Sequence, residues 1–456
     1  MKQRRLVRAL LAFLTITAAS SVPSLAQTRQ SFTLQEAVQF GVERNINIKN
    51  SQLDALSAEA RIQEIRSVAL PQVSFAGQIT SNLAIQTAFL PAVFAGGKPD
   101  DPPIAVQFGT KFQGFSQLSL NQLLFDAAYK VGLRAADVYR ELAQKNVNAS
   151  KITTAEQVSK AYYGVLVNQE RIKLLDLNIT RLDTLYKNTE ALNKQGFVEK
   201  IDVNRLEVQV NNLRAERQNV KNLVDLSYYL LKFQMGLGVN DDITLTEKIQ
   251  DINLDEASAA FATTNAPFNY GQRIEYSLLQ SQLQLADLDI QGTAKGYYPR
   301  LSFGATYGYN TGRNTFGELI TAPWFKLSAL SLNLAVPIFD GFAKKYQSQQ
   351  KRFMLQKAQQ SGELLKNSID LQVRQSAISM ANTVQTLRTQ KRNIDLAKEV
   401  VRVVQIKYKE GVGSNIEVLD AENSYRQAQT NYFTSLYEYL LTKVDFDKAN
   451  GKLLNE

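Results

Sequence analysis

The sequence predicts a mostly α-helical chain with a smaller β portion, built as two similar halves. All ten prolines lie at or before Pro103 or between Pro267 and Pro337, so residues 104–266 and 338–456 contain none. Apolar residues recur every seven positions in both proline-free blocks, and every two positions in the segment between them. Proline interrupts helix interiors, and sustained heptads are typical of coiled coils. Each proline-free block therefore predicts long, paired helices.

The residue composition fits a folded protein and excludes several kinds of chemistry. Of the 456 residues, 44% are hydrophobic and 21% charged, with no cysteine and no histidine. The chain thus lacks thiolates, disulfides and imidazoles, which are the usual soft-metal ligands and general bases. We expect no catalytic, cofactor-binding or metal site, no cofactor, and no enzymatic activity. Without the four bases near the N-terminus, 48 basic residues face 43 acidic ones, spread along the helices, so nucleic-acid binding is not expected.

Residues 1–26 are predicted to be a secretory signal peptide. A basic segment, Lys2–Arg8, precedes an apolar segment, Ala9–Ala19, and the run ends in Ser24-Leu25-Ala26. A short membrane anchor is the alternative, but the apolar run is too short to span a bilayer. No later stretch supplies about 18 uninterrupted apolar residues, so we expect an exported chain without a transmembrane helix.

Four helical segments are expected in the mature chain. They are a first-half helix (27–69), a first-half helical hairpin (127–236), a second-half helix (269–297) and a second-half helical hairpin (341–451). In the first hairpin Val158, Val165, Ile172, Ile179 and Tyr186 recur at intervals of seven. A single helix from Asp126 to Lys194 would be roughly 100 Å long at ~1.5 Å per residue. Such a length exceeds an ordinary globular domain.

Two β-hairpins are expected, at 70–126 with a long loop and at 298–340, and residues 237–268 are expected to be a connecting segment. Along the stretch 301–309, leucine, phenylalanine, alanine and two tyrosines alternate with small or polar residues. Each strand would have about 10 residues, one apolar face and one small-polar face, which is the pattern of a membrane barrel. An ordinary half-buried sheet is the alternative.

The two halves repeat the same order of elements. An offset of 215 residues relates Gly196 to Gly411 and Gly236 to Gly451. The strand segment LPQVSFAG likewise matches YPRLSFGA later in the chain. Each half reads as helix, strand, loop, strand, very long helix, glycine turn and helix, which indicates an internal duplication.

This duplicated order, together with YPRLSF, VPIFDG and the stretch YKEGVGSNIEVLDAENSY (408–425), resembles the TolC-type outer-membrane efflux protein family over nearly the whole mature chain. The family's hairpin tip reads Tyr, two residues, Gly, five residues, then Asp-Val-Leu-Asp-Ala. The resemblance implies a fold in which duplicated helical hairpins form a trimeric periplasmic tunnel and four strands per chain enter a shared 12-stranded outer-membrane barrel. Four strands alone would leave two unpaired edges in lipid, so closure requires several chains.

The resemblance also implies a function. The chain would be the passive outer-membrane channel subunit of a tripartite efflux or secretion system in a Gram-negative bacterium, extending into the periplasm. Its partners would be two further copies in a homotrimer, a periplasmic adaptor, an inner-membrane pump of the RND, ABC or MFS type, and outer-membrane lipid. The alternative is a secreted or surface coiled-coil scaffold without channel activity. The sequence does not name the exported substrate.

The candidate gate lies at the hairpin tips. Glu417 and Asp420 are spaced i,i+3 and share one helix face. Three copies would make two acidic rings, which favour cations. The resemblance implies that these two acids line the periplasmic constriction, and that the hydroxyl of Tyr408 donates to the carboxylate of Asp202 in the closed gate. Alternatively, the acids simply favour the dipole of a helix start, and the two readings are compatible.

Glycines are expected to form both tip turns, at Gly196 in the first tip and at Gly411 and Gly413 in the second. The tips also depart from the family. Its gate arginine falls on Gly413, and its partner threonine falls on Ile201. The arginine part of the latch is therefore missing or supplied by another base, for which the candidates are Lys200, Arg205 and Lys409.

Overall fold

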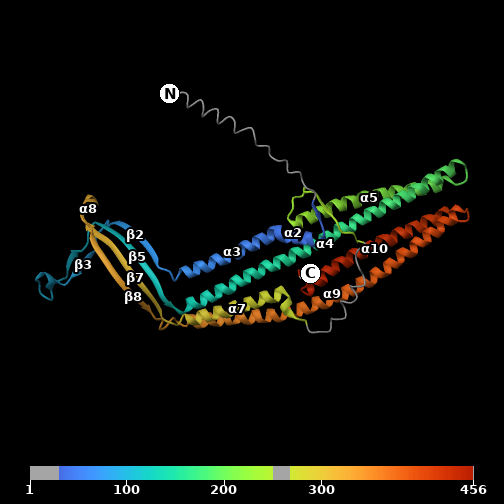
Figure 1. The fold of residues 1–456 in the computed structure, drawn as a ribbon. Helices are drawn as coiled ribbons and strands as arrows, with labels where there is room; N and C mark the ends of the chain where they lie inside the picture. The colour runs from blue at the N-terminus through green and yellow to red at the C-terminus, as the bar shows by residue number, and fades with distance from the viewer. Residues whose placement is uncertain (1–29, 250–267, 455–456) are drawn as a thin grey trace, which may run out of the picture. The chain divides into compact units, whose positions relative to one another are not determined.

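The computed structural model describes residues 30–249 and 268–454 (Figure 1), and the chain divides into two compact units. The described part of unit 1 comprises residues 30–46, 151–249 and 373–454, and that of unit 2 comprises 47–150 and 268–372. Both units take segments from both halves of the sequence. The signal peptide predicted at residues 1–26 lies outside the described residues.

Unit 2 contains an antiparallel sheet of four strands. In spatial order they are β2 (Gln72–Ser81), β5 (Phe112–Asp126), β7 (Arg300–Arg313) and β8 (Phe325–Ala335). The strands β2 and β5 come from the first half of the chain, and β7 and β8 from the second. The contact between β5 and β7 therefore joins the two halves in one sheet.

The register of this sheet confirms the predicted alternation of two residues. Val73 pairs with Leu120, Leu120 with Ala305, and Ala305 with Leu330, so one apolar row crosses all four strands. The adjacent row, one residue along each strand, carries small or polar side chains at Ser74, Ser119, Thr306 and Ala329. Val73 is 60% exposed and Leu330 is 77% exposed, so the apolar face is open in a single chain.

The two strand-connecting loops contain small elements that the sequence pattern did not predict. The first loop holds β3 (Thr87–Leu90) paired antiparallel with β4 (Ile104–Gln107), and a short 3-10 helix, η1 (Ala92–Ala95). The second loop holds the short helix α8 (Phe316–Thr321). Elements of four to six residues are too short to display a period.

The helices of unit 2 are α3 (Ile46–Ser67), η4 (Tyr270–Gln272) and α7 (Ile274–Lys295), with the first parts of α4 (Ala127–Lys194) and α9 (Ala343–Lys409). Asp126 caps α4, because its Oδ1 accepts from Ala128 N at 2.8 Å. Among the described residues, no helix is apolar over a long enough stretch to cross a membrane.

Unit 1 contains β1 (Gln30–Phe32), α2 (Leu34–Arg44), α5 (Lys200–Met235), β6 (Ile243–Leu245) and α10 (Asn415–Ala449), with the later parts of α4 and α9. The strands β1 and β6 pair in parallel. The predicted connecting segment, 237–268, thus includes a strand, and its residues 250–267 lie outside the described part.

The single first-half helix expected at 27–69 is corrected by the structure to a strand followed by two helices. Thr33 starts α2 through a capping box, in which Thr33 Oγ1 accepts from Glu36 N and Glu36 Oε2 accepts from Thr33 N. The break between α2 and α3 falls at Asn45, whose ψ of 132° is not helical. Asn45 Nδ2 donates to Gln234 O at 2.9 Å, which fixes this break against the end of α5.

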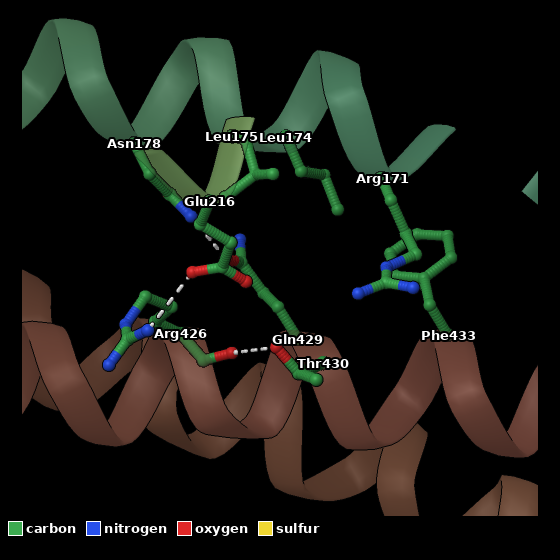
Figure 2. A pocket seen from close by; sticks show the side chains of 9 residues that line it. All are labelled: Arg171, Leu174, Leu175, Asn178, Glu216, Arg426, Gln429, Thr430 and Phe433. Carbon is green, nitrogen blue, oxygen red and sulfur yellow. Dashed lines mark hydrogen bonds and ion pairs between the residues drawn. The ribbon is translucent and has the colours of Figure 1, made fainter. Parts of the chain in front are cut away.

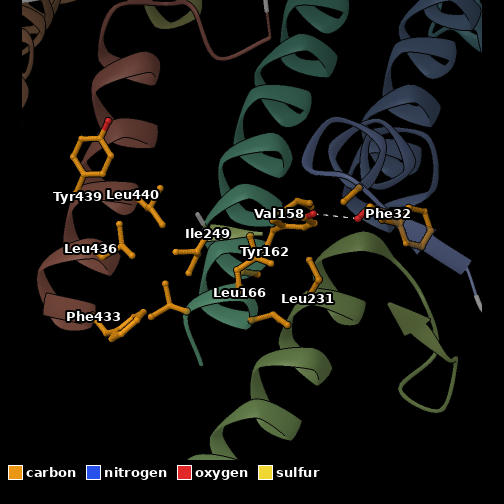
Figure 3. Packing of buried hydrophobic residues seen from close by; sticks show 14 of the residues in the cluster. Phe32, Val158, Tyr162, Leu166, Leu231, Ile249, Phe433, Leu436, Tyr439 and Leu440 are labelled. Carbon is orange, nitrogen blue, oxygen red and sulfur yellow. Dashed lines mark hydrogen bonds between the residues drawn. The ribbon is translucent and has the colours of Figure 1, made fainter. Parts of the chain in front are cut away.

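The core of unit 1 surrounds Tyr162 on α4 (Figure 3). Tyr162 is fully buried, and its Oη donates to Phe32 O at 3.1 Å. Burial raises the pKa of Tyr162, so the phenol stays protonated and keeps this donor role. Val158, Leu231 and Leu440 belong to the same cluster, which therefore packs α4, α5 and α10 together with β1.

Candidate functional site: the hairpin tips

The first tip joins α4 to α5 through a left-handed glycine. Gly196 has φ +79°, which side chains disfavour. Its N donates to Asn193 O at 2.9 Å, and Phe197 N donates to Leu192 O at 3.0 Å. These two bonds make a Schellman turn that satisfies the last carbonyls of α4.

The second tip joins α9 to α10 through the same turn. Gly411 has φ +77°, its N donates to Tyr408 O at 3.2 Å, and Val412 N donates to Lys407 O at 3.0 Å. Two glycines that align in the duplicated sequence therefore adopt one backbone geometry.

Gly413 is required for a different reason. Its φ is not left-handed, but a Cβ built on it would lie 2.9 Å from Tyr408 N and 3.1 Å from the carbonyl carbon of Lys407. The N of Gly413 also donates to Lys407 O at 3.1 Å. Any side chain here, including the family's arginine, would require the backbone to shift.

The acids Glu417 and Asp420 stand on the exposed face of α10. Ser414 caps this helix, because its Oγ accepts from Glu417 N at 3.3 Å. The neighbouring Val418 and Leu419 are 0% and 7% exposed and form the packed face. Both acids therefore point away from the helix packing of their own chain.

The structure does not form the predicted hydrogen bond between Tyr408 and Asp202. The Oδ1 of Asp202 instead lies 3.5 Å from Nη1 of Arg205 on the same helix, so one of the three candidate bases does contact this acid. The hydroxyl of Tyr408 is buried and has no hydrogen-bond partner among the described residues. The Tyr408 hydroxyl and the Asp202 carboxylate are thus both present at the tips, but they form no hydrogen bond with each other.

One weak contact does connect the two tips. Asn415, at the start of α10, is 6% exposed, and its Nδ2 donates to the backbone oxygen of Asp202 at 3.4 Å. Within the part of the chain that the structure describes, Asn415 Oδ1 and Thr189 Oγ1 are buried and have no partner. Buried polar groups without partners are costly, so the packing near the tips is polar and incompletely satisfied.

A stronger connection, which sequence reasoning missed, lies about two turns along α10 from the tip. Glu422 is 4% exposed. Its Oε2 accepts from Arg181 Nε at 3.0 Å and Nη2 at 2.6 Å, and its Oε1 accepts from Gln405 Nε2 at 2.9 Å. The sequence did contain a signal for this connection: Glu422 and Gln429 are seven residues apart and each follows a small residue of the heptad pattern, so both lie at the edge of the packed helix face.

Two further side-chain contacts between α10 and the first hairpin are visible in Figure 2. Asn178 Nδ2 on α4 donates to Gln429 Oε1 at 2.6 Å, and Arg426 Nη1 lies 3.2 Å from Glu216 Oε2 on α5. Phe433 lines the small pocket beside them. The contact between the hairpins is therefore polar here, although apolar clusters lie on either side of it.

Duplicated long helical hairpins, an open four-stranded sheet and glycine tips followed by exposed acids together characterise this fold. Residues 250–452 match the family model of the outer membrane efflux proteins. The predicted resemblance to the TolC-type family is confirmed.

Individual relatives agree with this family match along most of the chain. The chain is 21% identical to outer membrane protein TolC of Escherichia coli (strain K12), covering 95% of this chain and 85% of that protein. It is 22% identical to nodulation protein T of Rhizobium leguminosarum bv. trifolii, covering 89% and 82%. The open state of the Neisseria gonorrhoeae MtrE outer membrane channel is similar in fold, with a TM-score of 0.70, 16% identity, and coverage of 92% and 89%. The predicted fold of the single chain, duplicated long helical hairpins with four strands, is confirmed with it.

Proposed function

We propose that this chain is the outer-membrane channel subunit of a tripartite efflux or secretion system in a Gram-negative bacterium. It is a passive duct that receives substrates from an inner-membrane pump and a periplasmic adaptor and releases them outside the cell. The observation that carries this function is the open sheet with its exposed apolar rows. Such a face has no use on a coiled-coil scaffold in water, but it suits lipid.

Closure of the duct requires more than one copy. The strands β2 and β8 each have one neighbour among the described strands, so each leaves a row of backbone amides and carbonyls unpaired. In lipid such groups have no water to bond, and only a closed ring satisfies them. Three copies supply twelve strands, and the apolar rows that include Phe75 and Leu332 then face outer-membrane lipid.

The acids of the second tip form the selective part of the duct. In a trimer, Glu417 and Asp420 give two stacked rings of three carboxylates at the periplasmic end. Such rings attract cations and bind multivalent ones. Asp202 and Tyr408 lie beside this constriction, but without a hydrogen bond between them they do not latch it. The pump is of the RND, ABC or MFS type, and the duct itself performs no catalytic step.

The test is to express the full chain, isolate outer membranes, and extract them with a mild detergent. We expect a heat-sensitive trimer that forms discrete conductance steps in planar lipid bilayers. A chain that fractionates as a water-soluble monomer and carries no current would contradict the channel and favour the scaffold.

A further inference from the structure

The tips of this chain lack the arginine that the family places at Gly413. A Cβ at that position would lie 2.9 Å from the backbone N of Tyr408, and the Tyr408 hydroxyl has no partner among the described residues. Among the described residues, the hydrogen bond that joins the two tips is the 3.4 Å bond from Asn415 to Asp202, and Leu419 of α10 packs with Leu206 of α5 just behind it. If the tips close a duct, they are held together chiefly by contacts elsewhere.

The best-satisfied buried charge near the tips is the carboxylate of Glu422. Its side chain is 3% exposed, and both oxygens are bonded, to Arg181 through two nitrogens and to Gln405 through one. The two bonds from Arg181 are charge-assisted, and such bonds are stronger than neutral ones. The three residues, here named the clasp, come from three helices, α4, α9 and α10.

Arg181 is itself held in place. Its Nη2 also donates to Asn178 Oδ1 at 2.9 Å, and its guanidinium carbon lies 5.2 Å from the ring centre of Tyr425. A side chain fixed by a neighbouring amide and an aromatic face loses little further entropy on binding a carboxylate. Asn178 thus holds Arg181 from α4, whereas Tyr425 belongs to α10 and adds a second contact between the two helices.

Widening a constriction lined by Glu417 and Asp420 requires the start of α10 to move away from the duct axis. Glu422 lies five residues after Glu417, about 7 Å along the helix at ~1.5 Å per residue. A movement of α10 relative to α4 therefore separates Glu422 from Arg181 and leaves a buried charge without its partner, which is strongly unfavourable.

We propose that the clasp of Arg181, Gln405 and Glu422 is the principal latch of the closed state in this chain, acting two turns inside the tunnel in place of a latch at the tip. This rests on the proposed function, because a latch requires a duct. The residues are positioning residues: they touch no substrate, and they set the free-energy difference between closed and open arrangements.

The test compares single channels of the full-length trimer in planar bilayers. Glu422→Gln keeps the shape but removes the charge, and Arg181→Met removes the partner. We expect each to raise the open probability by at least about tenfold, because a broken buried pair shifts a two-state equilibrium by that much or more. Gln405→Leu is expected to give a smaller increase in the same direction.

Two controls separate a latch from a stability effect. Glu399→Gln breaks an exposed pair with Arg402 within one helix and is expected to leave gating unchanged. The double variant Arg181→Met with Glu422→Met replaces the buried pair by apolar side chains that can pack together, so both the thermal stability and the open probability of the trimer are expected to return toward the wild-type values. A structural role alone would change thermal stability without changing the gating of assembled trimers.

The outcomes are distinct. Wild-type gating of assembled Glu422→Gln trimers would overturn the clasp while leaving the channel intact. If that variant does not assemble, wild-type gating of assembled Arg181→Met trimers would overturn it in the same way. A wild-type protein that carries no current in any bilayer would instead overturn the proposed function. Higher open probability in both clasp variants, with an unchanged Glu399→Gln control, supports the latch.

Discussion

The two hairpin tips share a backbone but differ in chemistry. Both α4 and α9 end in a Schellman turn at a left-handed glycine, with φ of +79° at Gly196 and +77° at Gly411. The helix that follows is capped by Ser414 in the second tip, whereas Glu199 makes no side-chain cap in the first. The two halves therefore share the left-handed glycine turn that reverses the chain, whereas the side chains around that turn differ.

The acids show this divergence most clearly. Asp202 of the first tip lies 3.5 Å from Arg205. Glu417 and Asp420 of the second tip are exposed, and the sequence places no lysine or arginine within one helical turn of either. The first tip therefore carries a neutralised acid and the second an open acidic face. We therefore expect cations to interact with the second tip more strongly than with the first.

The largest expected effect concerns that acidic face. The double variant Glu417→Gln with Asp420→Asn removes six carboxylates from a trimer and should weaken block by a trivalent cation on the order of a hundredfold, because the rings lose all their charge. Asp202→Asn in the first tip should change the block by less than about twofold. The block of single-channel current by the cation is measured for both variants. Equal effects of the two variants would contradict the proposed difference between the tips.

The next effect tests the shared turn. Gly196→Ala and Gly411→Ala should each lower the free energy of unfolding by about 1–2 kcal/mol, because a left-handed backbone strains any residue with a Cβ. Nothing lies within 4 Å of a Cβ at either position, so the cost is conformational and should be similar at both. Denaturant unfolding of the two variants checks this, and a difference above about 1 kcal/mol would mean that the turns are not equivalent.

The smallest effect concerns the hydroxyl at the second tip. Tyr408→Phe should leave both stability and open probability unchanged, or raise stability slightly, because a buried hydroxyl without a partner contributes no bond. Thermal unfolding and single-channel gating provide the measurements. A clear rise in open probability would show that Tyr408 is a latch after all.

Most of the fold could be predicted because the sequence repeats its apolar residues with a regular period over long segments. The helix from Asp126 to Lys194 was expected and is observed from Ala127 to Lys194, because a long proline-free heptad pattern leaves little choice. The four strands were visible because a period of two persists over about ten residues. The strands β1 and β6 were not visible, since three residues show no period.

The candidate site was predictable only in part. The exposure of Glu417 and Asp420 followed from their helix face, and the glycine turns followed from residue type. The burial of Glu422 did not, because it depends on the position of Arg181, more than two hundred residues earlier in the chain. Likewise, whether Tyr408 bonds to Asp202 depends on where the side chains lie, and a sequence motif does not contain that information.

The order of strands in the sheet has a consequence for how copies recognise one another. The seam between β5 and β7 joins the last strand of one half to the first strand of the next. A contact from β8 of one copy to β2 of another repeats that relation, last strand to first, and is head-to-tail, so it generates a ring with a rotational direction. In the proposed channel, the internal seam of each chain would therefore be an example of the strand junction that joins neighbouring copies.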